Sequence, residues 1–149
     1  MSTVNYSNIY QAHLDTIHKK RSIPKMGTVS QEELNMVKNR AILITTLDVI
    51  LARHRQKFGT AYNLLSGRSA LIHLLIKLYK WPTALIRQMT LEDVLIALHD
   101  ELAYENLPTS FQTFLSSIGA NAYFVPFDDI IDGEWNPEHA KEHLKMLVE

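Results

Sequence analysis

The spacing of apolar residues along the chain predicts helices almost throughout. Close to the N-terminus, apolar side chains and one histidine recur at intervals of three and four and form one stripe: Tyr6, Ile9, Tyr10, His13, Leu14 and Ile17. This period is typical of an amphipathic helix, which we expect over about residues 7–20. Ile23-Pro24 then breaks the pattern, because the residue before a proline disfavours helical geometry.

The longest predicted helix covers about residues 31–58. Ser30 and Glu33 have the spacing of a capping box, no proline or glycine follows until Gly59, and glycine is a common residue at a helix end. Such a helix would be roughly 42 Å long at 1.5 Å per residue. A compact domain of this size is only about 26 Å across, so the helix must project, bend or pack along a partner chain. Apolar residues surround its middle, 41–52, which we expect to be buried.

Further helices follow in the second half of the chain. The same periodicity, with capping residues, Pro82, Gly119 and Pro137 as start and stop signals, predicts them over about 69–79, 83–89, 91–105, 109–118 and 136–148. Residues 122–127 form a short extended segment, in which Pro126 allows at best an edge strand. The prediction is therefore an all-α fold, an irregular bundle of six to seven helices in a single domain over 1–149.

The amino-acid composition indicates which class of protein this is but does not indicate a function. Hydrophobic residues make up 46% of the 149 residues and charged residues 21%, which is typical of a globular protein. The chain contains no cysteine, which excludes disulfides and thiolate chemistry. No secretory leader and no long apolar run is visible, so we expect a cytoplasmic protein without a membrane segment.

Charge is divided unevenly along the chain. Residues 1–81 hold twelve Lys and Arg against four Asp and Glu, and residues 82–149 hold three against twelve, although the net charge is only −1. Such an asymmetry points to a polar partner, or to two halves that pair with each other within a fold or a dimer.

Two basic clusters are candidate sites for nucleic acid or another anion. The first cluster contains Lys19, Lys20, Arg21 and Lys25, and the second contains Arg53, Arg55 and Lys57. Clustered cations can neutralise phosphates. Both clusters lie at the C-terminal ends of predicted helices, however, where cations also accumulate for local reasons, and the calculated isoelectric point of about 6.7 is near neutral.

One short motif suggests a metal site. His139-Ala140-Lys141-Glu142-His143 reads H-x-x-E-H and resembles the inverted zinc motif of the insulinase-like metallopeptidases. On a helix, His139 and His143 share a face and can reach one metal ion. The resemblance covers five residues and implies a third ligand, a glutamate far downstream, whereas only six residues follow His143.

No other catalytic set emerges from the sequence. There is no nucleophile elbow and no phosphate-cradling glycine loop, so we expect neither a cofactor nor catalysis. The overlong helix and the divided charge favour a non-catalytic helical binding or regulatory module that acts through protein–protein contacts and self-associates as a homodimer. The alternatives are a nucleic-acid-associated regulator that uses the basic clusters and a metal-dependent activity at His139 and His143.

Overall fold

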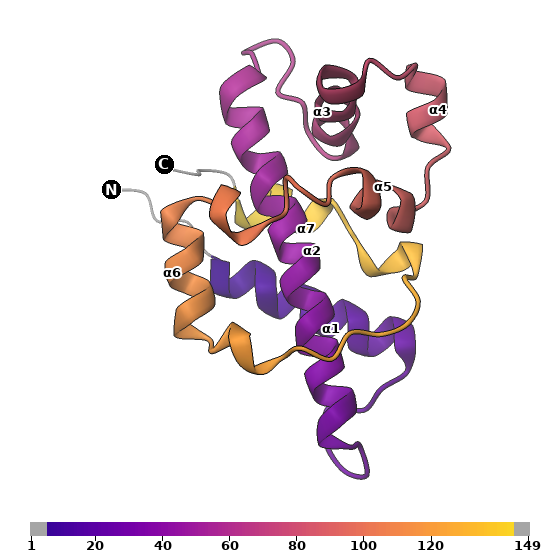
Figure 1. The fold of residues 1–149 in the computed structure, drawn as a ribbon, viewed down its shortest axis with the longest axis vertical. Helices are drawn as coiled ribbons and strands as arrows, with labels where there is room; N and C mark the ends of the chain where they lie inside the picture. Colours follow the sequence, from indigo (N-terminus) through magenta and orange to yellow (C-terminus); the bar gives the residue numbers. More distant parts are fainter. Residues whose placement is uncertain (1–5, 145–149) are drawn as a thin grey trace.

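The computed structural model describes residues 6–144, and within this range it is helical with no β-strand, as the sequence predicts (Figure 1). The α-helices are α1 (Tyr6–Arg21), α2 (Gln31–Phe58), α3 (Arg68–Tyr79), α4 (Thr83–Arg87), α5 (Leu91–Ala97), α6 (Thr109–Ser117) and α7 (Glu138–His143). Three 3₁₀ turns join them: η1 (Tyr104–Asn106), η2 (Ala120–Ala122) and η3 (Asp132–Glu134). None of the helices in the described range is long and apolar enough to cross a membrane.

Helix α2 is the axis of the molecule and runs along its longest dimension (Figure 1). The Ser30 hydroxyl accepts a hydrogen bond from the Glu33 amide at 3.1 Å, and the Gly59 amide donates to the Arg55 carbonyl at 2.7 Å. A Cβ at Gly59 would lie 2.6 Å from the Arg55 carbonyl oxygen, so only glycine fits this helix end. Residues 44–52 are all buried, which confirms the predicted burial of the middle.

The apolar core surrounds α2. Helix α1 crosses it, α6 lies along one side, α3 and α5 lie beside its second half, and α4 packs against α3 (Figure 1). The ring of Phe111 on α6 is fully buried and meets Tyr6 of α1 edge-on at 5.1 Å. A smaller cluster of Ile17, Val37 and their neighbours closes the core near the start of α2.

Helix α5 is shorter than the predicted 91–105 and ends at Ala97. The hydroxyl of Tyr79, from the end of α3, donates a hydrogen bond to the Ala97 carbonyl. In a continuing helix that carbonyl would accept from the amide of Glu101. The chain instead leaves the helix through turns and reaches η1.

The segment 122–127, predicted to be extended and at best an edge strand, lies outside the helices from residue 123 on and forms no strand with any described residue. Ala122 belongs to η2, and residues 123–127 cross α2 as an extended loop without a strand partner (Figure 1). Side chains of α2 take the place of that partner: Asn39 Nδ2 donates to the Tyr123 carbonyl at 2.7 Å, and Arg40 Nη2 donates to the Phe127 carbonyl at 3.3 Å.

The remaining helices match the sequence pattern, with small differences at their ends. Helix α4 ends at Arg87 rather than at residue 89, and α6 ends at Ser117. Helix α7 begins at Glu138 and ends at His143. The predicted continuation of this last helix over 145–148 lies outside the described residues.

Candidate functional site

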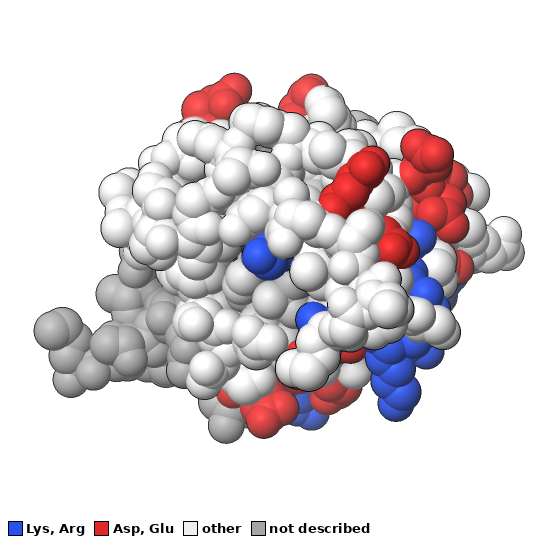
Figure 2. All heavy atoms as spheres, turned by 90° about the horizontal axis from the view of Figure 1, so that it is seen from below, with Lys and Arg blue, Asp and Glu red and all other residues white. Residues whose placement is uncertain are grey.

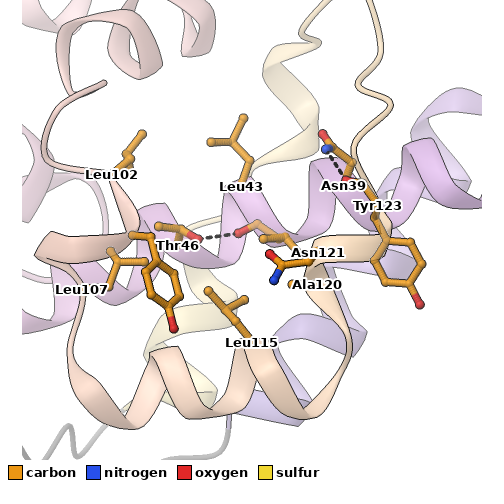
Figure 3. Close-up of a pocket in the computed structure, with 11 residues that line it drawn as sticks. Asn39, Leu43, Thr46, Leu102, Leu107, Leu115, Ala120, Asn121 and Tyr123 are labelled. Atoms are coloured by element: carbon orange, nitrogen blue, oxygen red, sulfur yellow. Dashed lines mark hydrogen bonds between the residues drawn. The ribbon is translucent and has the colours of Figure 1, made fainter.

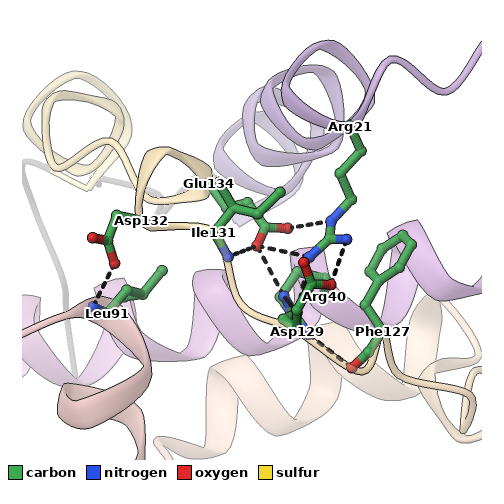
Figure 4. A network of polar contacts seen from close by, with 8 residues as sticks. All are labelled: Arg21, Arg40, Leu91, Phe127, Asp129, Ile131, Asp132 and Glu134. Carbon is green, nitrogen blue, oxygen red and sulfur yellow. Dashed lines mark hydrogen bonds and ion pairs between the residues drawn. The ribbon is translucent and has the colours of Figure 1, made fainter.

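A buried carboxylate, Glu134, lies at the centre of a polar network (Figure 4). Its Oε1 accepts from Arg40 Nη1 at 2.9 Å and from the Ile131 amide at 2.7 Å, and its Oε2 accepts from Arg21 Nε at 3.0 Å. Burying an unpaired charge is very unfavourable, and here two guanidinium groups and an amide compensate one carboxylate.

The same guanidinium groups hold the segment that precedes Glu134. Arg40 and Arg21 both donate to the Asp129 carbonyl, and Arg21 also pairs with the Asp129 carboxylate at 2.9 Å. The Arg21 guanidinium lies 3.8 Å from the centre of the Phe127 ring (Figure 4). Residues 127–134 are therefore fastened to α1 and α2 at several points.

Burial and pairing shift the pKa values of these groups in different directions. Burial lowers the pKa of Arg40, although Glu134 opposes the shift. Burial also disfavours the Arg21 cation, but hydrogen bonds to Glu134 and Asp129 outweigh it and raise the pKa of Arg21. The neighbouring Arg21 lowers the pKa of the exposed Asp129 carboxyl.

A second buried group joins α1, α2 and the chain before α7. Asp48 accepts from His13 Nε2 at 2.7 Å and from the Trp135 indole N–H at 2.8 Å. Within the described part of the chain, His13 Nδ1 has no hydrogen-bond partner. The rings of His13 and His139 meet edge-on at 5.2 Å, and burial, with the nearby His13, lowers the pKa of His139.

The two histidines of the H-x-x-E-H motif have different surroundings. His139 Nε2 lies 3.0 Å from the Thr16 hydroxyl, and His143 Nε2 lies 3.9 Å from a Glu142 carboxylate oxygen. Residues 6–144 contain no group of three or more His, Asp or Glu side chains arranged to hold a metal ion. Metal binding at His139 and His143 stays a prediction.

The first basic cluster separates into paired and unpaired cations. Arg21 is bound by Glu134 and Asp129, and Lys25 pairs with Asp15, which lowers the pKa of that carboxyl. Lys19 and Lys20 form no ion pair with any residue of the described range.

The second basic cluster lies apart from the first. Arg21 of the first cluster shares Glu134 with Arg40, whereas Arg53 of the second cluster lies roughly 20 Å farther along α2 than Arg40, at 1.5 Å per residue. Lys77 of α3 joins it, and the ammonium groups of Lys57 and Lys77 lie 5.3 Å and 4.6 Å from the centre of the Phe58 ring. We call the four cations Arg53, Arg55, Lys57 and Lys77 the basic end of α2. In the part of the chain that the structure describes, none of them forms an ion pair.

Two histidines share a hydrogen bond beneath this basic end. His54 Nε2 lies 2.7 Å from His73 Nδ1, and both rings pack against Phe58. Burial, together with His73 and the nearby cations Lys77 and Lys57, lowers the pKa of His54 to about 4. The His54 ring is therefore neutral at pH 7.

The largest uncharged part of the chain is the stretch 106–127, which contains no Asp, Glu, Lys or Arg. This stretch includes α6, η2 and the loop across α2, and we call its surface the uncharged face. Figure 2 views the molecule from below and shows a broad area in which most side chains are uncharged, with isolated basic groups within it and the other charged groups at its margins. The run of uncharged residues is visible in the sequence, but it does not by itself predict that this stretch forms one surface.

A pocket of about 340 Å³ opens on the uncharged face (Figure 3). Leu43, Leu107 and Leu115 give it apolar walls, and Asn39, Thr46 and Asn121 contribute polar groups. A smaller hollow of about 300 Å³ shares Tyr104, Leu115, Ala120 and Asn121 with it, so the pocket continues along α6.

Two tyrosines line this pocket, and exposed apolar side chains follow one of them along the chain. Tyr104 and Tyr123 line it, and the next residues along the chain, Phe124 and Val125, are 76% and 44% exposed. The pocket thus has an apolar interior and an aromatic rim, which is the usual composition of a ligand or protein contact site.

Another hollow lies between α4 and α5. It has a volume of about 340 Å³ and is lined by Trp81, Leu85, Met89, Asp93, Ile96 and Ala97. Ile96 is 69% exposed. This hollow differs from the uncharged face because Asp93 lies in its wall.

Comparison with known proteins adds no relative. No protein-family model, no curated protein and no solved structure matches this chain.

The buried network makes a direct prediction about stability. Glu134→Gln keeps the shape of the side chain but leaves Arg21 and Arg40 without their buried counter-ion. Because breaking a buried pair costs about 3–5 kcal/mol, we expect the free energy of unfolding in urea to fall by about 3 kcal/mol. Asp129→Asn is the control and should cost far less, because Asp129 is exposed and Arg21 keeps Glu134. A Glu134→Gln protein as stable as the wild type would contradict this assignment.

The His54 pKa predicts a loss of stability in acid. Between pH 6.5 and about 4, the unfolded chain binds a proton at His54 that the folded protein does not bind. Stability from this group is present above pH 6.5 and lost as the pH falls, by up to about 3 kcal/mol. Urea unfolding from pH 7 to pH 4 should show a smaller loss for His54→Leu than for the wild type. His99→Gln, at an exposed histidine, should keep the wild-type profile.

Proposed function

We propose that this protein is a non-catalytic helical binding module that self-associates through its uncharged face. The observation that carries the proposal is the pocket in Figure 3, which opens on a surface without a charged residue from 106 to 127. The cores of protein–protein interfaces are depleted of charge and enriched in aromatic side chains. Tyr104, Tyr123 and Phe124 supply such side chains here.

The lack of charge favours a second copy of the chain as the partner. In a two-fold dimer the same surface of each subunit faces the other. A charged surface would then face a surface of the same charge on the other subunit, and the repulsion between like charges is unfavourable. Residues 106–127 themselves add no such repulsion, although the ammonium group of Lys38 on α2 lies 4.9 Å from the centre of the Tyr123 ring at the rim.

Phe124 is the side chain best suited to fill the pocket of a second copy. It is 76% exposed, it follows Tyr123 at the rim, and an aromatic ring is small enough for a 340 Å³ space. In a two-fold arrangement each subunit would supply one Phe124 and receive the other.

The rim is held in place before any partner arrives. Asn39 and Arg40 bind the carbonyls of Tyr123 and Phe127, which lie on either side of the exposed residues 124–126. Ordering a loop on binding costs free energy, and a loop fixed in advance avoids most of that cost.

Sedimentation velocity over a range of concentrations tests this proposal. The wild type should form dimers, and Phe124→Glu should be monomeric because a two-fold contact would bury two like charges. Ile96→Glu is the matched control, since Ile96 is a comparably exposed apolar residue on α5. It should dimerise like the wild type. Dimers lost in Ile96→Glu but kept in Phe124→Glu would contradict the proposal and indicate the hollow between α4 and α5.

The basic end of α2 supports a second candidate function, nucleic-acid binding. Its four cations form no ion pair in the described range, and Lys57 and Lys77 flank the Phe58 ring. Burial lowers the pKa of Arg55, and the Asp48 carboxylate opposes that shift. Unpaired cations neutralise phosphates, and an aromatic ring can stack on an unpaired base.

Fluorescence anisotropy with a labelled single-stranded DNA tests the second candidate. Binding should weaken as salt rises, and Lys57→Gln with Lys77→Gln should reduce the steepness of that salt dependence by about one to two counterions. Lys141→Gln, which removes an exposed lysine of α7, should bind as the wild type does. Binding that is independent of salt, or equally weakened by Lys141→Gln, would exclude this assignment.

A further inference from the structure

A hollow of about 380 Å³ lies between the end of α1, η3 and the start of α7. Its walls include Thr16, Lys19, Lys20, Gly133, Trp135 and Asn136. It is separate from the uncharged face and from the basic end of α2, because it shares no residue with either. It therefore calls for an explanation of its own.

Positive charge in this hollow is not compensated by the neighbouring acids. Lys19 and Lys20 form no ion pair in residues 6–144, and no carboxylate lines the hollow. The acids on either side of Gly133 have other partners (Figure 4): Asp132 accepts from the Leu91 amide at 2.8 Å, and Glu134 binds the two arginines.

The wall at Gly133 is shaped for a lysine. A Cβ at this position would lie 3.0 Å from Cε and 3.3 Å from Nζ of Lys20, so the Lys20 side chain lies directly against the glycine. The absence of a side chain at Gly133 thus brings the Lys20 ammonium group into the hollow wall.

Hydrogen bonds within the protein fix the other side chains of the wall, and one hydrogen-bond donor group remains available to a ligand. The Trp135 ring is held by its indole hydrogen bond to Asp48, and the Thr16 hydroxyl donates to the Ala12 carbonyl. The Asn136 Oδ1 accepts from the Glu138 amide at 3.0 Å. The Asn136 NH₂ group makes no hydrogen bond with a described residue and can donate to a ligand.

We infer that this hollow binds a small organic phosphate monoester. A phosphate monoester carries nearly two negative charges near neutral pH and three terminal oxygens. The two ammonium groups match that charge, and with the Asn136 amide they give one donor group to each oxygen. Ligand sites occupy about 300–1,000 Å³, so this hollow has room for a small organic group against Trp135 beside the phosphate.

Titration calorimetry on the whole protein tests this inference with inorganic phosphate, ribose 5-phosphate and AMP as probes, and with sulfate for comparison. At least one of the two esters should bind more tightly than inorganic phosphate and sulfate. Lys20→Gln should weaken that binding by roughly tenfold or more, because it removes a charge-assisted hydrogen bond. Gly133→Ala keeps every charge but displaces Lys20, so it should weaken binding by a smaller factor.

Lys80→Gln is the matched control, since it removes the same charge from an exposed lysine that lines neither this hollow nor the basic end of α2. It should bind the esters as the wild type does. Three results would overturn the inference: no ester binds at millimolar concentration, sulfate binds as tightly as the esters, or Lys80→Gln weakens binding as much as Lys20→Gln. Thermal unfolding of each variant without ligand shows whether it is folded, and ester binding by Gly133→Ala remains informative if Lys20→Gln is unstable.

Discussion

Two ionisable residues buried on α2 must be compensated inside the protein, and the arrangement of the other elements depends on them. Arg40 and Asp48 are 2% and 1% exposed. Their partners come from α1 and from residues 127–135, so both of these parts are fastened to one helix. The bonds from Arg40 also hold the loop that carries Phe124 across α2. The rim of the pocket on the uncharged face is thus positioned by a buried charge.

The sequence predicts the parts of this fold that local signals determine. Ser30 and Gly59 mark both ends of α2, because capping depends on residues within a few positions of the helix end. The end of α5 could not be predicted, since a hydroxyl of Tyr79, eighteen residues away, takes the carbonyl of Ala97. The extended segment likewise has side chains of α2 as its partners rather than a strand.

The candidate sites were harder to predict from the sequence than the helices, because the sites depend on pairing between residues far apart in the chain. Arg21 and Lys20 are adjacent in one basic cluster, yet Arg21 is bound by Glu134, 113 residues away, while Lys20 remains free of any described carboxylate. No local pattern predicted that Asp48 would be buried and hydrogen-bonded, because its partners lie 35 and 87 residues away. The positive first half and the negative second half of the chain thus pair only in part within the fold. The cations at the basic end of α2 form no ion pair with a described residue.

Hydrogen–deuterium exchange at a low and a high protein concentration tests the central claim, that the uncharged face is the surface of self-association. If the claim is right, the amides of residues 104–127 exchange more slowly at the high concentration, while those of α5 and of the basic end of α2 do not change. Exchange that is independent of concentration, or slowed in residues 83–97 instead, would contradict it.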